Sequence, residues 1–181
     1  MTAEIRIAGP EALPGFVALV EAAADWLWAQ GIRQWTPGNM RAKEAELRRK
    51  LDRGWLVTAV VAGPTGADEA APEIVAGCLL TRLAPPQWHG RTATAAGAAY
   101  LERLVVARPF AGRGLSHAIV AACEGLARRH RLDALRLDCW TGNETLKALY
   151  RDRGFQEVAE LLSEGHRITL FEKTLGGAPT A

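Results

Sequence analysis

The turn Gly112-Arg113-Gly114 is the part of the sequence best suited to chemistry. It follows a strand-like stretch, 102–106, and opens a segment with helical periodicity that starts at Leu115. Such a turn presents backbone N–H groups at a helix N-terminus, where the helix dipole also favours negative charge. The two glycines permit positive φ and close approach to a ligand. The turn therefore predicts a phosphate or pyrophosphate site, the alternative being an ordinary strand-to-helix connection.

A second block of residues, about thirty positions downstream, supplies polar side chains. Asn143 and Tyr150 lie on a further predicted helix, and Gly154-Phe155 follows it. A phenol in this position can donate a proton to a leaving group, or it can be a packed aromatic residue whose hydroxyl pairs with the backbone. Asn143 stands where a helix N-cap belongs, and its amide can also bind a ligand.

The elements that must position these residues follow from hydrophobic periodicity and from glycine and proline. In chain order we expect a strand, two helices, three strands, a helix, a strand, a helix and two strands. The ranges are 4–8, 10–30, 41–52, 55–62, 74–83, 100–107, 115–130, 132–140, 143–153, 155–162 and 166–173. The strands that flank helix 115–130 should be parallel with a right-handed crossover. The fold class is α/β (α+β), with a mixed, mostly antiparallel sheet flanked by helices.

Length and composition limit the classes of protein that the chain can represent. One domain is expected over residues 1–175, with a disordered tail at 176–181. The connection 84–98 is long and rich in small residues, and such loops often carry function.

The net charge of +2 is too small to indicate nucleic acid or a membrane. The basic run 128–131 lies at a helix C-terminus, where the dipole favours cations.

Targeting signals and cysteines give expectations about location. We find no signal peptide and no apolar run near about 18 residues, so a cytoplasmic location is expected. Cys78, Cys123 and Cys139 lack metal-site or disulfide-framework spacing, so we expect them to be buried and reduced.

The element order and both motifs resemble the GNAT superfamily of acyl-CoA-dependent N-acyltransferases. The signature of that family, Gln/Arg-x-x-Gly-x-Gly/Ala, aligns with residues 111–116, and Gly114 takes the central glycine position. Ala111 and Ser116 depart from the signature at its first and last positions. These departures keep the backbone donors but remove one side-chain contact to phosphate.

The second motif of the family is better kept. Its members often have Asn, then Tyr seven residues later and Gly-Phe four residues after the Tyr, as Asn143, Tyr150 and Gly154-Phe155 do here. Leu146 stands where a small residue is usual.

The resemblance implies a sheet splayed at its centre and transfer of an acetyl group from acetyl-CoA to a primary amine of a small molecule. The amine attacks the thioester directly in a ternary complex, with no metal and no acyl-enzyme. Tyr150 is implied as general acid and Glu102 as general base. The implied coenzyme A contacts are Leu104, Val105 and Val106 on the strand, Gly112, Arg113, Gly114, Leu115 and Ser116 in the turn, and Asn143.

Several of these roles have a plain structural alternative. Glu102 is either a base or a surface or salt-bridged residue near Arg103, and Asp138 and Glu73 are weaker candidates for the base. His89 either contacts substrate or is an uninvolved loop residue. Arg113 either binds phosphate or is exposed, and for Ser116 helix capping is favoured over a phosphate contact.

Partners and rival functions also stay open. Trp26, Trp28 and Trp35 either line an acceptor pocket or pack in a core or dimer, and a homodimer is compatible with the exposed sheet ends. Rival functions are acylation of a protein or peptide amine or of aminoacyl-tRNA, and a non-catalytic acyl-CoA-binding regulatory module.

Overall fold

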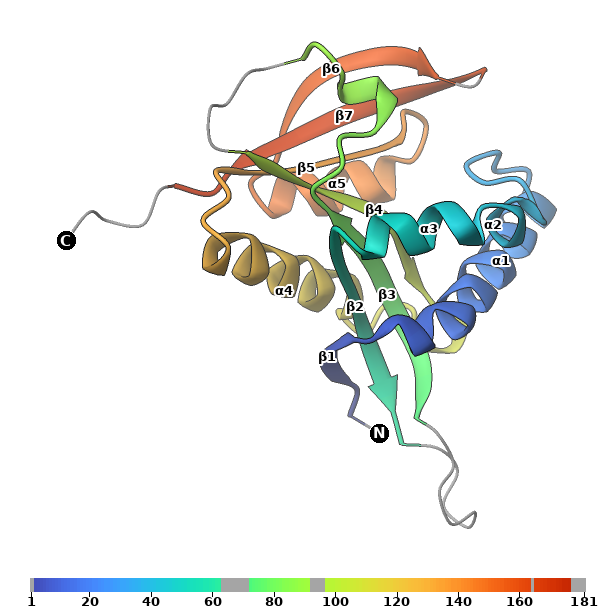
Figure 1. Cartoon of the computed structure of the whole chain (residues 1–181). Coiled ribbons are helices and arrows are strands. Elements are labelled where there is room, and N and C mark those ends of the chain that lie inside the picture. Colours follow the sequence, from blue (N-terminus) through green and yellow to red (C-terminus); the bar gives the residue numbers. More distant parts are fainter. Residues whose placement is uncertain (1, 63–71, 92–96, 164, 177–181) are drawn as a thin grey trace.

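A computed structural model describes residues 2–62, 72–91, 97–163 and 165–176. Seven strands form one sheet in the order β1-β2-β3-β4-β5-β7-β6 (Figure 1). Neighbouring strands are antiparallel except β4 and β5, which are parallel. The strands are β1 Glu4–Ala8, β2 Gly54–Val61, β3 Glu73–Thr81, β4 Ala98–Val106, β5 Ala134–Trp140, β6 Gln156–Ser163 and β7 His166–Thr174. The helices are α1 Leu13–Ala29, α2 Asn39–Ala42, α3 Glu44–Leu51, α4 Leu115–Arg129 and α5 Glu144–Asp152.

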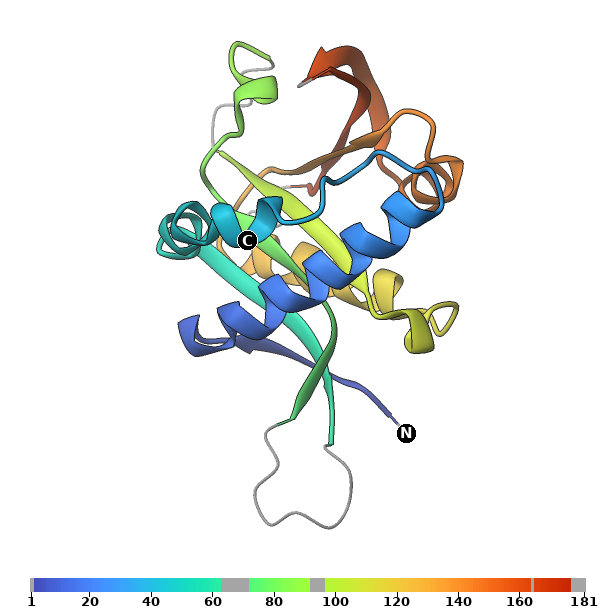
Figure 2. The same ribbon diagram turned by 90° about the vertical axis from the view of Figure 1, so that its right-hand side faces the viewer.

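Helices cover both faces of this sheet because the strands alternate apolar side chains between the two faces. Leu56 and Val57 are neighbours on β2, yet Leu56 packs with residues of α1 and α3 and Val57 with residues of α4. Figures 1 and 2 show the two layers, with α1 to α3 on one side of the central strands and α4 on the other. The predicted mixed sheet flanked by helices is confirmed.

A β-bulge interrupts β4 in the middle of its pairing with β3. Leu79 pairs with Glu102 and Gly77 with Val105, so β4 holds one more residue than its partner between these pairs. Arg103 sits in the bulge with φ of 61°, a left-handed conformation that is uncommon for residues other than glycine. As a result Leu101 and Leu104, three positions apart, both join the core on the α4 side.

Beyond the bulge, the centre of the sheet opens. The β4–β5 pairing covers only Ala98–Tyr100 against Ala134–Arg136. The remaining residues of both strands, through Val106 and Trp140, continue without pairing to each other. The predicted splay at the centre of the sheet is therefore confirmed.

One expectation about local structure needs correction. The stretch Pro10–Ala29 is by length and composition apolar enough to cross a membrane, although we expected no such run. In the structure its buried residues, among them Phe16 and Val20, pack against the sheet. Within the connection 84–98, Pro86–Trp88 forms a 3-10 turn with Trp88 buried. Its residues 92–96, and residues 177–181 of the expected tail, lie outside the described residues.

Candidate active site

A cavity of about 340 Å³ lies where β4 and β5 separate. Its floor comes from the two strands, one wall from α3 and the segment before α2, and another wall from α5 and β7. Because the bulge breaks the alternation of β4, consecutive residues of that strand, 101–104, all line it. Charged and polar lining residues are Arg33, Gln34, Lys43, Glu46, Lys50, Gln87, Glu102, Arg103, Asp138, Ser163 and His166.

Tyr150 lines this cavity from α5, where its ring packs at centroid distances of 5.9 Å from Phe155 and 5.4 Å from Phe171. In the part of the chain that the structure describes, no residue hydrogen-bonds to its hydroxyl. Burial, followed by the charges of Cys139 and Asp138, raises the pKa of the phenol well above its ordinary value of 10.0. The hydroxyl therefore stays protonated at neutral pH and is available as a donor.

Glu102 lies on β4 at the bulge and belongs to a buried ionic cluster. Its Oε2 accepts a hydrogen bond from Lys50 Nζ at 2.7 Å, and Lys50 also pairs with Glu46 at 3.0 Å. Its other oxygen, Oε1, is buried and has no hydrogen-bond partner. A buried acceptor without a partner is costly, so this oxygen is free to accept a bond from a bound molecule. Glu102 is therefore salt-bridged but is not a surface residue.

Asp138 faces the same cavity from β5, across the gap from Glu102. Its Oδ2 accepts a hydrogen bond from Gln87 Nε2 at 2.8 Å. Burial raises the pKa of this carboxyl above its ordinary value of 3.8, although the Gln87 bond and the charge of Arg103 oppose the rise. A carboxylate shifted towards neutral pH is better suited to take a proton from an ammonium group.

The edge of β4 that faces the gap carries free backbone groups. Ala107 N–H donates to Val75 O at 2.8 Å, so it points towards β3. Backbone groups alternate between the two edges of a strand. Those of Val105 therefore also face β3, and those of Leu104 and Val106 face the gap. This is the edge to which an extended ligand can bind as a further strand does.

The turn 112–116 lies past the end of the same strand. Gly112 and Gly114 have φ of 75° and 77°, as the sequence predicts, and a Cβ on either would meet no atom within 4 Å. The glycines are needed here for conformation and not for lack of space. Within the described residues, no protein acceptor takes the N–H groups of 112–116. These donors open α4 and suit an anionic ligand.

The side chains of Ser116 and Arg113 bear on two alternatives from the sequence. Gly114 occupies the N-cap position of α4 and no side chain caps the helix, so the expectation that Ser116 caps it is wrong. Ser116 is the second helical residue, past the position from which a side chain caps. Arg113 is exposed, with its guanidinium 5.1 Å from the Phe110 ring, and its contact with phosphate stays a prediction. Leu115 begins the helix.

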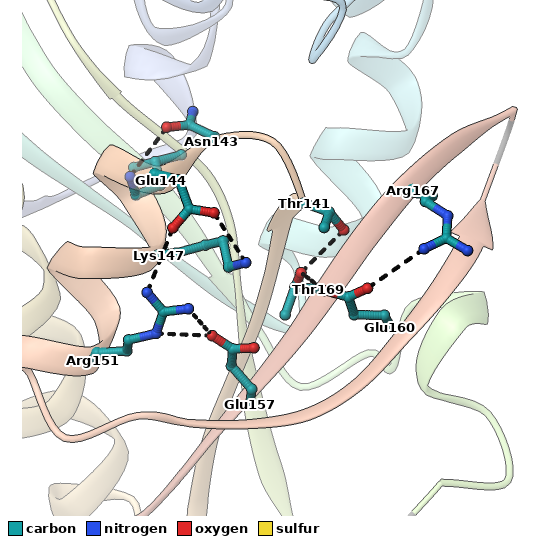
Figure 3. Close-up of polar contacts among 10 residues, drawn as sticks. Thr141, Asn143, Glu144, Lys147, Arg151, Glu157, Glu160, Arg167 and Thr169 are labelled. Carbon is teal, nitrogen blue, oxygen red and sulfur yellow. Dashed lines mark hydrogen bonds and ion pairs between the residues drawn. The ribbon is translucent and has the colours of Figure 1, made fainter.

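Asn143 is the N-cap of α5, where its Oδ1 accepts a hydrogen bond from Leu146 N–H at 3.1 Å (Figure 3). Its Nδ2 donates to Gln34 Oε1 at 2.8 Å and so links α5 to the segment between α1 and α2. The capping role is confirmed. The contact with a cofactor stays a prediction, and Nδ2 carries two N–H donors, of which the bond to Gln34 uses one.

Figure 3 also shows how α5 is held against β6. Arg151 on α5 donates from Nε to Glu157 on β6 at 2.8 Å, and Glu144 contacts both Lys147 and Arg151. The pair Arg151–Glu157 links the helix that carries Tyr150 to β6, and the two contacts of Glu144 lie within α5.

Two other candidates from the sequence, Glu73 and His89, are not among the residues that line the cavity. Glu73 is exposed at the start of β3, and His89 bonds Ala84 O of its own loop at 3.1 Å. Of the three clustered tryptophans Trp35 lines the cavity, whereas Trp26 and Trp28 stack with Arg108 and Arg33. The cysteines are buried and free, as expected.

Sequence reasoning pointed to the second helix and to the connection 84–98 as segments beside the acceptor, but it missed the individual residues that they contribute, Gln87 among them. Lys43, Glu46 and Lys50 are spaced by three and four residues, which places them on one face of a helix. That spacing is visible in the sequence, but it cannot tell a face turned towards a cavity from one turned towards solvent. Gln87 carries no local signal.

Comparisons with known proteins agree with this geometry. The family described as "Acetyltransferase (GNAT) family" matches residues 20–155. An uncharacterized N-acetyltransferase from Bacillus subtilis (strain 168), YesJ, is 26% identical over 161 residues, which cover 87% of this chain and 82% of YesJ.

Solved structures share the fold at lower sequence identity. A GNAT-family acetyltransferase from Listeria monocytogenes superposes with a TM-score of 0.68 at 22% identity, covering 95% of this chain and 94% of that one. The yncA protein of Salmonella typhimurium, solved with its cofactor acetyl-CoA, superposes with a TM-score of 0.66 at 13% identity, covering 100% of this chain and 98% of that one.

Proposed function

Because this chain belongs to the GNAT acetyltransferase family, and is therefore an acyltransferase, we propose that it transfers the acetyl group of acetyl-CoA to the primary amine of a small molecule. The reaction is a direct attack in a ternary complex. We also propose a cytoplasmic location, supported by the burial of the apolar side chains of α1 against the sheet.

The observation that carries this proposal is the shared cavity in the β4–β5 gap. It brings Glu102 from one strand and Tyr150 from α5 to the same space. The free backbone edge of β4 leads from that space towards the turn 112–116, whose N–H donors have no protein acceptor among the described residues. Both features fit a long ligand with a phosphate-bearing end and a reactive end.

The residues divide the proton transfers between them. Glu102 Oε1, which is buried without a partner, accepts a proton from the incoming amine, since only the neutral amine is a nucleophile. The amine nitrogen then bonds to the thioester carbonyl carbon as the carbon–sulfur bond breaks. Tyr150 donates its proton to the departing sulfur, and the nitrogen gives up its second proton, which restores the phenol. The burial that raises the pKa of the phenol also disfavours a bare thiolate beside it, which promotes this transfer.

The volume of the cavity supports a small acceptor. About 340 Å³ falls at the low end of the roughly 300–1,000 Å³ typical of small-molecule sites. A peptide N-terminus is the rival acceptor, because only its terminal amine and first side chain would need to enter.

A thiol-release assay tests the proposal. The purified protein is incubated with acetyl-CoA and single amines, including small amines, lysine-containing peptides and peptides with a free N-terminus. We expect free thiol and an N-acetylated product, identified by mass spectrometry, with a small amine as the best acceptor. If thiol is released only with peptides, the acceptor is a peptide amine and not a small molecule. If no amine is acetylated, the proposal is overturned.

A further inference from the structure

The cavity contains more charged groups than the proposed acid and base account for. Glu102 and Asp138 lie on its floor, on β4 and β5. On the side of α3 it is lined by Lys43, Glu46 and Lys50, and Arg103 projects into it from the bulge of β4. These charges fall into a group that is paired within the protein and a group that is not.

Lys50 is paired twice. Its Nζ lies 3.0 Å from Glu46 and 2.7 Å from Glu102, and its side chain is 15% exposed. A cation held between two carboxylates has its charge fully balanced, so Lys50 is not available to bind an anion from outside.

Lys43 and Arg103 are half-buried and lack such partners. In the described part of the chain, no carboxylate oxygen lies within 4.0 Å of either cation. Among the described residues, the one side-chain hydrogen bond of Arg103 runs from Nε to Met40 Sδ at 3.2 Å, and a thioether is a weak acceptor. A partly desolvated cation without an anion is unfavourable, so these two groups favour an anion supplied by a ligand.

The field of these cations reaches other groups of the cavity. Burial alone would raise the pKa of Glu46, but the Lys50 bond and the charges of Lys50, Lys43 and Arg103 outweigh it and lower that pKa. Arg103 also acts on Asp138. The charge of Arg103 therefore acts on carboxylates of both α3 and β5, and that of Lys43 on Glu46.

The floor of the cavity carries two carboxylates, which suit a cationic amine. Glu102 Oε1 has no hydrogen-bond partner, and Asp138 has a hydrogen bond from Gln87 but no cation within 4.0 Å among the described residues. An amine with up to three N–H donors can satisfy both carboxylates at once.

We propose that the acceptor is a small zwitterionic amine of the amino-acid type, whose amine lies against Glu102 and Asp138 and whose anionic group lies against Arg103 and Lys43. This inference rests on the proposed acetyl transfer and names the class of its acceptor. One charged end fixes the amine beside Tyr150, and the other rejects amines that lack an anion, since those would leave two cations unpaired.

Matched acceptors test the inference. Free L-amino acids are compared with their α-carboxamides and with the amines that lack the carboxyl group, in the thiol-release assay. Phosphoethanolamine and taurine are added to separate a requirement for carboxylate from a requirement for any small anion. We expect kcat/KM to be at least about 30-fold higher for an amino acid than for its carboxamide, about 2 kcal/mol of discrimination from two charge-assisted bonds.

Variants of Arg103 and Lys43 test whether these two cations cause the preference for amino acids over carboxamides. Arg103→Gln and Lys43→Gln should each lower kcat/KM for amino acids at least tenfold and change that for carboxamides little, while Arg103→Lys should retain part of the preference. Arg49→Gln removes the same charge from an exposed position of α3 outside the cavity and is the matched control. Binding of an amino acid to the protein saturated with coenzyme A, measured by calorimetry, should weaken in parallel.

The outcomes separate this inference from the proposed function. Equal turnover of amino acids and carboxamides, or variants that leave their ratio unchanged, would refute the zwitterionic acceptor while acetyl transfer stands. If Arg103→Gln does not fold, Lys43→Gln and the acceptor series decide the question. If coenzyme A binds but no amine is acetylated, the proposed function fails and the inference with it.

Discussion

Tyr150 combines a packed ring with a hydroxyl that no described residue engages. Tyr150→Phe keeps the ring against Phe155 and Phe171 and removes only the proton donor. We expect kcat to fall about 100-fold or more, the usual contribution of a general acid, with little change in melting temperature or in the Kd for coenzyme A. Steady-state thiol release, thermal denaturation and calorimetry measure the three quantities, and an unchanged kcat would remove Tyr150 from the mechanism.

Asp138 should make stability depend on pH. Burial raises its pKa in the folded protein above the ordinary 3.8, so between these two values the folded state holds a proton that the unfolded state has released. Its contribution to the free energy of unfolding is therefore lost as pH rises through that window. In Asp138→Asn the loss is absent, and the new amide oxygen can still accept the Gln87 bond.

We accordingly expect the melting temperature of Asp138→Asn, relative to that of the wild type, to increase between about pH 4 and pH 7. Thermal denaturation at several pH values measures this difference. A difference that stays constant or decreases with pH would contradict the burial of an ionisable carboxylate at this position.

At the scale of single residues the sequence indicates those that belong to local motifs and misses those brought in by tertiary contacts. The glycines of the turn and the Asn143 cap were predictable because their roles depend on neighbours along the chain. The pairing of Glu102 with Lys50 joins residues 52 positions apart and leaves no local pattern. Neighbouring residues of a regular strand point to opposite faces, so the sequence does not indicate that Glu102 and Arg103 both face the cavity. They do so because of the bulge, which arises from the pairing of β4 with β3.

At the scale of elements, the turn before α4 allows a controlled test. Gly114→Ala puts a side chain on a residue with φ of 77°, which should cost about 1 kcal/mol of stability and disturb the N–H donors of the turn. Gly31→Ala is the matched control, since Gly31 has φ of 76° and the same open surroundings but follows α1.

Both variants should lose similar stability by chemical denaturation, while only Gly114→Ala should weaken coenzyme A binding, by at least about fivefold, or roughly 1 kcal/mol. If both variants bind coenzyme A as the wild type does, the ligand does not use this turn.

The order of the elements is predictable because each strand and helix carries its own periodicity, and most observed bounds lie within a few residues of those expected. The short α2 is an exception. It starts where the buried carboxylate of Glu21, on α1, accepts hydrogen bonds from the N–H groups of Gly38, Met40 and Arg41 at 2.7 to 2.9 Å. This contact between distant segments stabilises the N-terminus of α2, and no local pattern in residues 39–42 encodes it.

For the molecule as a whole, Glu124 joins three elements on the face opposite α1. Its buried carboxylate on α4 contacts Arg153, after α5, at 2.8 Å and Lys173, on β7, at 3.0 Å. Glu124→Ala leaves these cations without their partner and should lower the free energy of unfolding by about 3–5 kcal/mol. Glu44→Ala breaks a surface pair with Arg48 and should cost less than about 1 kcal/mol. Denaturant titration measures both, and equal losses would contradict a connecting role for Glu124.

The central claim is that coenzyme A occupies the gap between β4 and β5, and a crystal structure of its complex with this protein tests it most directly. We predict the pyrophosphate against the N–H groups of 112–116, the pantetheine along the free edge at Leu104 and Val106, and the sulfur within about 3.5 Å of the Tyr150 hydroxyl. A structure with the ligand bound elsewhere, or with its sulfur distant from Tyr150, would contradict the account.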